Sequence, residues 1–376
     1  MKKLKIVYLT GTRADFGLMT PVLKAINSDP YFNLKILVTG MHLMPKFGSS
    51  IKEVKKIFPN LAILPAVFES DKQKSVANFC AKLLPLITKK LIYLKPDLVL
   101  ILGDRPEMLV FAMAAFYLQI PIAHIHGGDK TQTLDDCARH AITKLSSLHF
   151  VATKEAQKKI INFGEKKERV YLVGAPALDV IKNINLLSKS ELSEILNINL
   201  KKYILLTIHP ISEKVELAST QMETILKAIT KFNLQTIIIY PNADPGGRAI
   251  IRVIKKYENK QQIYFFKNLS HKTFLSLVKH AQVWLGNSSA GIIESASFKI
   301  PVINIGSRQD GRVRAKNIID VDYDKKQIIN AMKKALNLTY RKSLTNLKNP
   351  WGNGNTSKLI VNILKNIKID RRLLTK

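Results

Sequence analysis

Short apolar runs alternate with segments of helical period along the whole chain, and this alternation constrains the fold more than any other feature. Such runs predict strands at residues 4–9, 34–39, 97–102, 122–125, 149–152 and 170–173 in the first half. They predict a second series at 203–207, 236–240, 263–265, 283–285 and 302–305. Strands that alternate with helices form parallel sheets covered on both faces, joined by right-handed crossovers. The sequence therefore predicts an α/β protein.

The 376 residues are enough for two such domains. The first series of strands ends near residues 174–179, and a weaker stretch rich in Asn, Ser and Lys follows it. We therefore expect two doubly wound, Rossmann-like domains, at 1–175 and 176–356. A helix within about 357–376 is expected to pack back on the first domain. Two such domains facing each other would bring the loops after their strands to a shared cleft.

The formal net charge of +31 raises the possibility of nucleic-acid binding. Lysine, however, supplies 47 of the 59 basic residues, and the lysines are scattered over nearly every predicted helix. They form no stripe and are not interleaved with aromatic side chains. This distribution indicates a solvated surface, so we expect no nucleic-acid partner.

Membrane and secreted classes are also disfavoured. The longest apolar stretch, 108–118, is too short to span a bilayer, and no cleavable signal is visible at the start. The two cysteines, Cys80 and Cys137, provide neither a disulfide framework nor a zinc ligand set. We expect a cytoplasmic protein that has no membrane contact.

The segment 286–308 carries the most chemical information. Its Gly-Asn-Ser-Ser run ends a predicted strand, and Ser288 or Ser289 can cap the helix that follows. Free N–H groups at such a helix start favour a phosphate. Glu294 lies further along the helix, where it can accept hydrogen bonds from sugar hydroxyls, and Arg308 can clamp an anion. The alternative is a generic capped helix.

Loops after the first-half strands carry further candidates. Gly11-Thr-Arg13 follows the first strand, where Arg13 could meet a phosphate, although a structural turn explains this motif as well. A buried strand then delivers Asp104 and Arg105, as a base or sugar ligand beside a guanidinium. An Asp that caps its own helix is an equally good interpretation of that second motif.

The next loop begins His124-Ile-His126-Gly-Gly-Asp129. The two histidines alternate across the strand end, so one of them can be structural. Asp135 or Asp136 lies near a helix start. These residues lack the spacing of a tetrahedral metal site, so we expect no metal.

In the second half, His209 and Asn242 also follow predicted strands. They are expected at the same edge as the serines of the 286–308 segment.

Together these motifs resemble those of the hydrolysing UDP-N-acetylglucosamine 2-epimerases, which start sialic-acid-type pathways. The matching elements run in family order over about 300 residues. They are Gly-Thr-Arg13-Ala-Asp, Gly-Asp104-Arg105, His-Ile-His126-Gly-Gly, Asp135-Asp-(three residues)-Arg139-His-Ala-Ile-Thr-Lys, Thr-Ile-His209-Pro, Pro-Asn242, Gly-Asn-Ser288-Ser289-Ala-Gly291-(two residues)-Glu294 and Asn304-(three residues)-Arg308-Gln-(one residue)-Gly-Arg312.

The resemblance implies a glycosyltransferase-B-like fold whose C-terminal domain binds UDP, and a homo-oligomer, either dimer or tetramer. It implies elimination of UDP to a glycal, followed by hydration to N-acetylmannosamine, without a cofactor. Asp104, His126 and Asp135 are its expected catalytic residues. Its expected substrate-binding residues are Arg13, His42, Arg105, Asp129, His209, Asn242, Ser288, Ser289, Gly291, Glu294 and Arg308.

Two departures keep the details open. Some members carry Glu at the position of His126 and many carry Glu at that of Asp129, so the group that removes the C2 proton stays undecided. The same motifs also occur in epimerases of UDP-2,4-diacetamido-2,4,6-trideoxyhexose, used for legionaminic acid, which is the alternative substrate. A non-hydrolysing epimerase typically has Gly-Thr-Arg-Pro-Glu in its first loop, where this chain has Ala14 and Asp15. A glycosyltransferase, or a basic protein without enzymatic activity, is less consistent with the clustered motifs.

Overall fold

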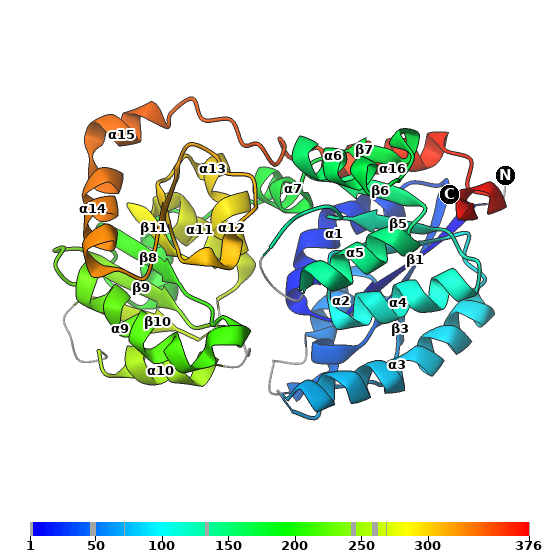
Figure 1. Ribbon diagram of the computed structural model, residues 1–376, viewed down its shortest axis with the longest axis horizontal. Coiled ribbons are helices and arrows are strands. Elements are labelled where there is room, and N and C mark those ends of the chain that lie inside the picture. Colours follow the sequence, from blue (N-terminus) through cyan, green and yellow to red (C-terminus); the bar gives the residue numbers. More distant parts are fainter. Residues whose placement is uncertain are drawn as a thin grey trace. The chain divides into compact units, whose positions relative to one another are not determined.

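Two parallel β-sheets organise the chain, each within its own compact unit (Figure 1). The computed structural model describes residues 3–45, 50–70, 72–131, 135–241, 246–257, 262–267 and 269–375. The first unit comprises Met1–Lys182 and Trp351–Lys376, and the second comprises Asn183–Pro350. The prediction of an α/β fold with two parallel-sheet domains is thus confirmed. The predicted seam at 175/176 lies at the start of helix α7, whereas the division into compact units comes near that helix's end.

The described residues of the first unit form a seven-stranded sheet in the order β3-β2-β1-β4-β5-β6-β7, with every pair parallel. Its strands are β1 (Leu4–Thr10), β2 (Phe32–Val38), β3 (Leu61–Ile63), β4 (Leu98–Leu102), β5 (Ile122–Ile125), β6 (Leu148–Val151) and β7 (Val170–Leu172). Its α-helices are α1 (Arg13–Ser28), α2 (Ile51–Ile57), α3 (Gln73–Leu94), α4 (Pro106–Tyr117), α5 (Asp135–Leu145), α6 (Lys154–Asn162), α7 (Pro176–Asn183) and α16 (Thr356–Asn366). Short 3-10 helices lie at η1 (Gly40–Leu43), η3 (Lys167–Arg169) and η6 (Arg371–Leu374).

Strand β1 shows why this sheet is covered on both faces. Successive side chains of a strand point to opposite faces. Ile6 and Tyr8 are buried with residues of α1 and α16, whereas Val7 and Leu9 are buried with residues of α3 and α4. A central strand with apolar residues on both faces is typical of a doubly wound sheet.

The C-terminal segment belongs to the first unit. Ile360 and Leu364 of α16 are fully buried in the same core cluster as Met19 of α1. Asp179 of α7 accepts hydrogen bonds from the backbone N–H groups of Thr356 (2.8 Å) and Ser357 (2.6 Å). The carboxylate therefore caps α16 by satisfying N–H groups that the helix itself cannot pair.

The second unit has a six-stranded parallel sheet among its described residues, in the order β10-β9-β8-β11-β12-β13. Its strands are β8 (Tyr203–Thr207), β9 (Gln235–Ile239), β10 (Ile263–Phe266), β11 (Val283–Gly286), β12 (Val302–Ile305) and β13 (Ile318–Val321). Its helices are α8 (Lys189–Leu196), η4 (Ser212–Leu217), α9 (Ala218–Ile229), α10 (Gly247–Lys255), α11 (His271–His280), α12 (Ser289–Ile293), α13 (Ser295–Phe298), η5 (Ser307–Gln309), α14 (Lys325–Leu336) and α15 (Leu338–Ser343). No helix in the described ranges is both long and apolar enough to cross a membrane.

Each sheet reverses its winding direction between two central strands. In the first unit the reversal lies between β1 and β4, and in the second between β8 and β11. Ligands of open α/β sheets bind beyond the carboxyl ends of the strands at such a switch point. The loops after β1 and β4 carry Arg13 and Asp104, and the loops after β8 and β11 carry His209 and Ser288. The fold thus brings sequence candidates to the switch point of each unit.

Candidate active site

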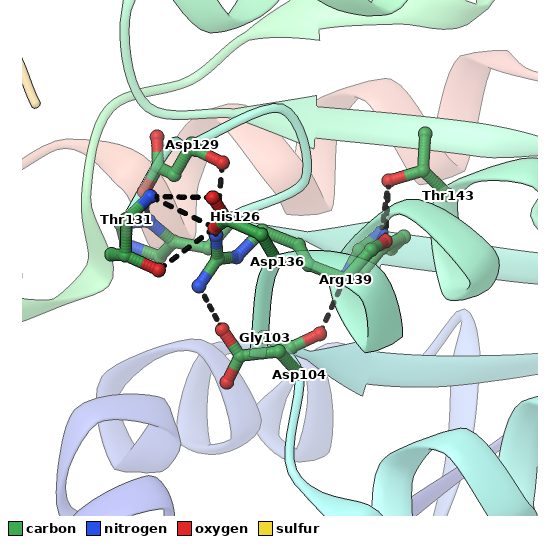
Figure 2. Close-up of polar contacts among 9 residues, drawn as sticks. Gly103, Asp104, His126, Asp129, Thr131, Asp136, Arg139 and Thr143 are labelled. Atoms are coloured by element: carbon green, nitrogen blue, oxygen red, sulfur yellow. Dashed lines mark hydrogen bonds and ion pairs between the residues drawn. The ribbon is translucent and has the colours of Figure 1, made fainter. Parts of the chain in front are cut away.

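Arg139 of α5 organises the acidic residues of the first unit (Figure 2). Its guanidinium forms ion pairs with Asp104, which follows β4, and with Asp136. It also donates a hydrogen bond of 2.9 Å to the backbone oxygen of Asp129. Burial acts to lower the pKa of Arg139, but these carboxylates raise it overall. A permanently charged guanidinium therefore fixes Asp136 in its own helix and the loops that carry Asp104 and Asp129.

His126 lies in the same cluster. Its Nδ1 is 2.9 Å from Oδ2 of Asp129, and its ring centroid is 6.2 Å from that of Trp351. The backbone of His126 is left-handed, with φ of 65°. This conformation is uncommon outside glycine.

His124 has a structural role instead. It is fully buried, with Nε2 2.8 Å from the backbone oxygen of Gly103 and Nδ1 3.1 Å from Oγ1 of Thr143. Burial lowers its pKa to about 3, so the ring is neutral at physiological pH. His124 joins β5 to α5 and to the turn after β4.

Asp136 makes contacts that the sequence did not assign to it. Its carboxylate accepts hydrogen bonds from the backbone N–H of Thr131 (2.8 Å) and from the Thr131 hydroxyl (2.7 Å), besides its ion pair with Arg139. Asp135, the expected catalytic residue, is exposed at the first position of α5. The neighbouring aspartates thus occupy different surroundings, and a catalytic role for Asp135 stays a proposal.

His42 belongs to a buried hydrogen-bonded chain beneath the loop after β1. Its Nε2 is 2.9 Å from Oγ1 of Thr10, its Nδ1 is 2.7 Å from Oγ of Ser50, and the residue is fully buried. Burial lowers its pKa to about 4. Both ring nitrogens already contact protein hydroxyls. We therefore assign His42 a structural role in place of the expected contact with a substrate.

Asp15 closes the same loop. It accepts hydrogen bonds from the backbone N–H groups of Gly11 (3.1 Å) and Thr12 (2.7 Å), and it forms a capping box with Thr12. Burial raises the pKa of Asp15 to about 6. The Ala-Asp version of the first loop therefore has a structural purpose, which is to hold the turn that precedes α1.

The two arginines predicted at this edge differ in their surroundings. Arg13 is exposed and pairs with Glu53 of α2 through a 3.0 Å contact from Nε. Arg105 donates from Nε to Oε1 of Glu107 at 2.6 Å. The Glu107 side chain is fully buried, and a Cβ placed on Gly11 would lie 2.2 Å from Oε1. Glu107 thus requires glycine at position 11. Only the position of Glu107, an acidic residue at a helix start, could have indicated this contact from the sequence.

In the second unit, Asn287 connects the loops after β8 and β11. Its Oδ1 accepts from the backbone N–H of His209 and its Nδ2 donates to the His209 oxygen, both at 2.8 Å. The backbone oxygen of Asn287 accepts hydrogen bonds from Arg308 Nη1 (3.0 Å) and Gln309 Nε2 (2.9 Å). Asn287 therefore brings His209 and Arg308 to one place, a function that only the folded structure reveals.

The serines after β11 lie at the start of α12. Ser288 is at the N-cap position, but its side chain makes no capping hydrogen bond, contrary to one of our expectations. Ser289 is the first helical residue, and both serines are half-buried. Gly286 has φ of 147°, and a Cβ there would lie 1.9 Å from the Thr207 oxygen, so only glycine fits. The close approach of β11 to β8 thus fixes the backbone that leads into the two serines.

Glu294 has a buried carboxyl group. Within the described residues its Oε2 has no hydrogen-bond partner, and burial raises its pKa to about 8. A buried carboxyl oxygen without a protein partner is able to interact with a bound ligand. Gly291, one turn earlier, has only ordinary contacts at its Cβ position, the nearest at 3.6 Å from Val302. Glycine weakens a helix. Close packing does not require one at this position.

Two further expectations concern Asn242 and a metal ion. Asn242 lies outside the described residues. Among the residues that are described, no group of three or more His, Cys, Asp or Glu side chains could hold a metal ion.

Comparison with known proteins identifies the family. The family model described as UDP-N-acetylglucosamine 2-epimerase matches residues 24–365. The chain belongs to the UDP-N-acetylglucosamine 2-epimerase family. The resemblance drawn from the sequence motifs is thus confirmed.

Relatives within this family differ in the sugar for which they are named. The chain is 39% identical to a hydrolysing UDP-N,N′-diacetylbacillosamine 2-epimerase of Legionella pneumophila, over 99% of this chain and 98% of that protein. It is 38% identical to a hydrolysing GDP/UDP-N,N′-diacetylbacillosamine 2-epimerase of Campylobacter jejuni, over 85% of each chain. A UDP-N-acetylglucosamine 2-epimerase of Neisseria meningitidis is 34% identical over 89% of this chain and 88% of that protein.

Solved structures of the family share the fold. The UDP-GlcNAc 2-epimerase of Neisseria meningitidis, bound to UDP-GlcNAc, superposes with a TM-score of 0.84 at 21% identity, over 97% of this chain and all of that one. This similarity confirms the expected glycosyltransferase-B-like class of the fold.

Proposed function

We propose that this epimerase-family member is a hydrolysing 2-epimerase of UDP-N,N′-diacetylbacillosamine. The observation that carries the proposal is the 39% identity, over 99% of the chain, to a Legionella pneumophila protein of that name. UDP-N-acetylglucosamine, the first choice from the sequence, becomes the second candidate. It is supported by the 34% identity to the Neisseria meningitidis relative.

The reaction that we propose has two steps. A base removes the proton from C2 of the sugar, the C–H electron pair forms a C1=C2 double bond, and UDP leaves C1 with the electrons of the C–O bond. Water then adds its oxygen to C1 of this glycal, and a proton adds to C2 from the opposite face. The products are UDP and the free 2-epimeric sugar, so one water is consumed for each UDP released.

Acid–base groups of the first unit support this chemistry. Proton transfer from carbon needs a positioned base. Asp104 is fixed by Arg139, and His126 is fixed by Asp129. We assign these two residues, with Asp135, to proton transfer and to binding of the sugar.

Groups of the second unit support the binding of UDP. Residues 286–308, which run from the end of β11 into η5, carry the hydroxyls of Ser288 and Ser289, the buried carboxyl of Glu294 and the guanidinium of Arg308. We assign the two serines and Arg308 to the diphosphate and Glu294 to ribose hydroxyls. The remaining residues of the proposed substrate-binding set are His209, Asn242, Gly291, Arg13 and Arg105. Cationic and N–H groups can stabilise a departing diphosphate, so we propose that catalysis needs no metal and is unaffected by EDTA.

Several properties of the whole protein belong to the same proposal. We infer a cytoplasmic homo-oligomer, dimer or tetramer, that binds neither nucleic acid nor membrane. Light scattering on the purified protein measures the oligomeric state directly, and a monomeric mass would exclude this part.

The choice of sugar is tested by comparing two substrates. UDP release is measured with UDP-N,N′-diacetylbacillosamine and with UDP-GlcNAc under identical conditions, and kcat/KM is compared. We expect the diacetamido sugar to be preferred. A preference for UDP-GlcNAc would restore the second candidate, and consumption of an added acceptor sugar would instead indicate a glycosyltransferase.

A further inference from the structure

The loop after β5 holds a histidine and an aspartate in a fixed relation. Nδ1 of His126 is 2.9 Å from Oδ2 of Asp129, and the side chain of Asp129 is only 5% exposed (Figure 2). The His126 side chain is 15% exposed. In the part of the chain that the structure describes, Nε2 of His126 has no recorded hydrogen bond. One ring nitrogen is therefore committed to the protein, and the other is left for a ligand.

The loop backbone is locked in place around this pair. A Cβ on Gly127 would lie 2.9 Å from Nδ1 of His124, and a Cβ on Gly128, whose φ is 78°, would lie 2.6 Å from the Ala156 oxygen. The backbone N–H of His126 donates to the Phe150 oxygen at 3.1 Å. The left-handed backbone of His126 is thus held by this hydrogen bond and by the tight packing of the two glycines that follow, as is common for strained residues at functional sites.

Arg139 fixes the aspartate. It donates to the backbone oxygen of Asp129 at 2.9 Å, and the Asp129 carboxylate is among the charges that raise the pKa of Arg139. A nearby guanidinium favours the ionised carboxylate. An ionised carboxylate only accepts hydrogen bonds, so the proton of this contact must lie on Nδ1 of the histidine.

We propose that Asp129 is a positioning residue for His126. It holds the neutral imidazole with its proton on Nδ1, which leaves the lone pair on Nε2 to accept a proton from the sugar. The proposal rests on the function proposed above, and it changes the expected part of Asp129. The residue acts through His126 and does not bind the substrate itself.

Histidine tautomers can be measured without any substrate. In protein labelled with ¹⁵N at histidine, the His126 signals are assigned by their loss in His126→Gln. At a pH where the ring is neutral, we expect a protonated Nδ1 and an unprotonated Nε2. In Asp129→Ala the group that accepts from Nδ1–H is removed, so the proton should move toward Nε2. Lys130→Gln, which alters an exposed neighbour in the same loop, should leave the tautomer unchanged.

A double-mutant cycle tests the functional half of the proposal. Asp129→Ala and His126→Gln should each lower the turnover of the UDP-sugar by roughly 10²–10⁴-fold. Because the aspartate acts through the histidine, the double variant should be no slower than His126→Gln alone. A double variant that loses the product of both factors would show that Asp129 acts independently and would overturn the proposal.

The two measurements separate the two proposals. An unchanged tautomer in Asp129→Ala overturns the positioning role even if the enzyme is an active epimerase. Absence of UDP release from either nucleotide sugar in the wild-type protein would refute the proposed function, and the tautomer measurement would still decide the relation between Asp129 and His126.

Discussion

The guanidinium of Arg139 forms an ion pair with the carboxylate of Asp104, and this contact joins α5 to the loop after β4 (Figure 2). The two residues are 35 positions apart in sequence. Arg139 is almost completely buried, whereas the Asp104 side chain is 22% exposed. The buried guanidinium therefore fixes a partly exposed carboxylate at the edge of the sheet.

Replacement of Asp104 by asparagine should affect catalysis more than nucleotide binding. Asp104→Asn preserves the shape of the side chain but removes its negative charge, so turnover should fall by roughly 10²–10⁴-fold if the group transfers a proton. UDP affinity, measured by calorimetry, should change much less. Near-normal turnover would remove Asp104 from the mechanism.

Arg308 and Ser289 should contribute to UDP affinity. Arg308→Ala and Ser289→Ala each remove proposed hydrogen bonds to the diphosphate, which we expect to cost on the order of 1.5–3 kcal/mol for each charge-assisted bond. Lys316→Ala, which removes an exposed charge from the same unit, serves as the control. An unchanged dissociation constant for UDP in Arg308→Ala would exclude that residue from the phosphate site.

Glu294 should release a proton when UDP binds. Burial raises the pKa of Glu294 to about 8, so its carboxyl group is largely protonated at pH 7. Ribose hydroxyls that donate to the carboxylate favour its ionised form, so binding should release about one proton per UDP. Calorimetry in two buffers of different ionisation enthalpy measures this proton. Release that persists unchanged in Glu294→Gln would assign the proton to another group.

His42 should stabilise the fold in a pH-dependent way. Its folded pKa is lowered to about 4 from the usual 6.5, so its contribution is present above pH 6.5 and is lost as the pH falls toward 4. The unfolding free energy of the wild-type protein relative to that of His42→Gln should therefore be about 2 kcal/mol lower at pH 5 than at pH 7. The raised pKa of Asp15 acts in the opposite direction, and the comparison of the two proteins largely cancels that term.

Chemical unfolding at the two pH values measures this difference. An equal difference in unfolding free energy at pH 7 and pH 5 would contradict the buried, neutral state of His42.

The strands could be predicted because parallel strands buried on both faces are continuous apolar runs. Each predicted strand is found, displaced by at most two residues at either end. The two strands that were missed, β3 and β13, are edge strands, short and partly exposed. Leu61–Ile63 is only three residues long, and Asp320 interrupts the apolar residues of Ile318–Val321, so neither run is distinct from a loop.

The candidate site was predictable only in part, for a different physical reason. Strand-end motifs place residues such as Asp104 and Ser288 at a sheet edge, because parallel strands align their carboxyl ends. The partners of these residues depend on side-chain contacts across the fold. Glu107 against Gly11, and Asn287 between His209 and Arg308, are examples that no local spacing reveals.

The most direct test of the account is the fate of hydrogen at C2. The protein is incubated with UDP-N,N′-diacetylbacillosamine in heavy water, and the released sugar is analysed by NMR. Elimination followed by hydration predicts one UDP for each free 2-epimeric sugar, with deuterium at C2. A product that retains the original hydrogen at C2, or that keeps its UDP, would contradict the proposed mechanism.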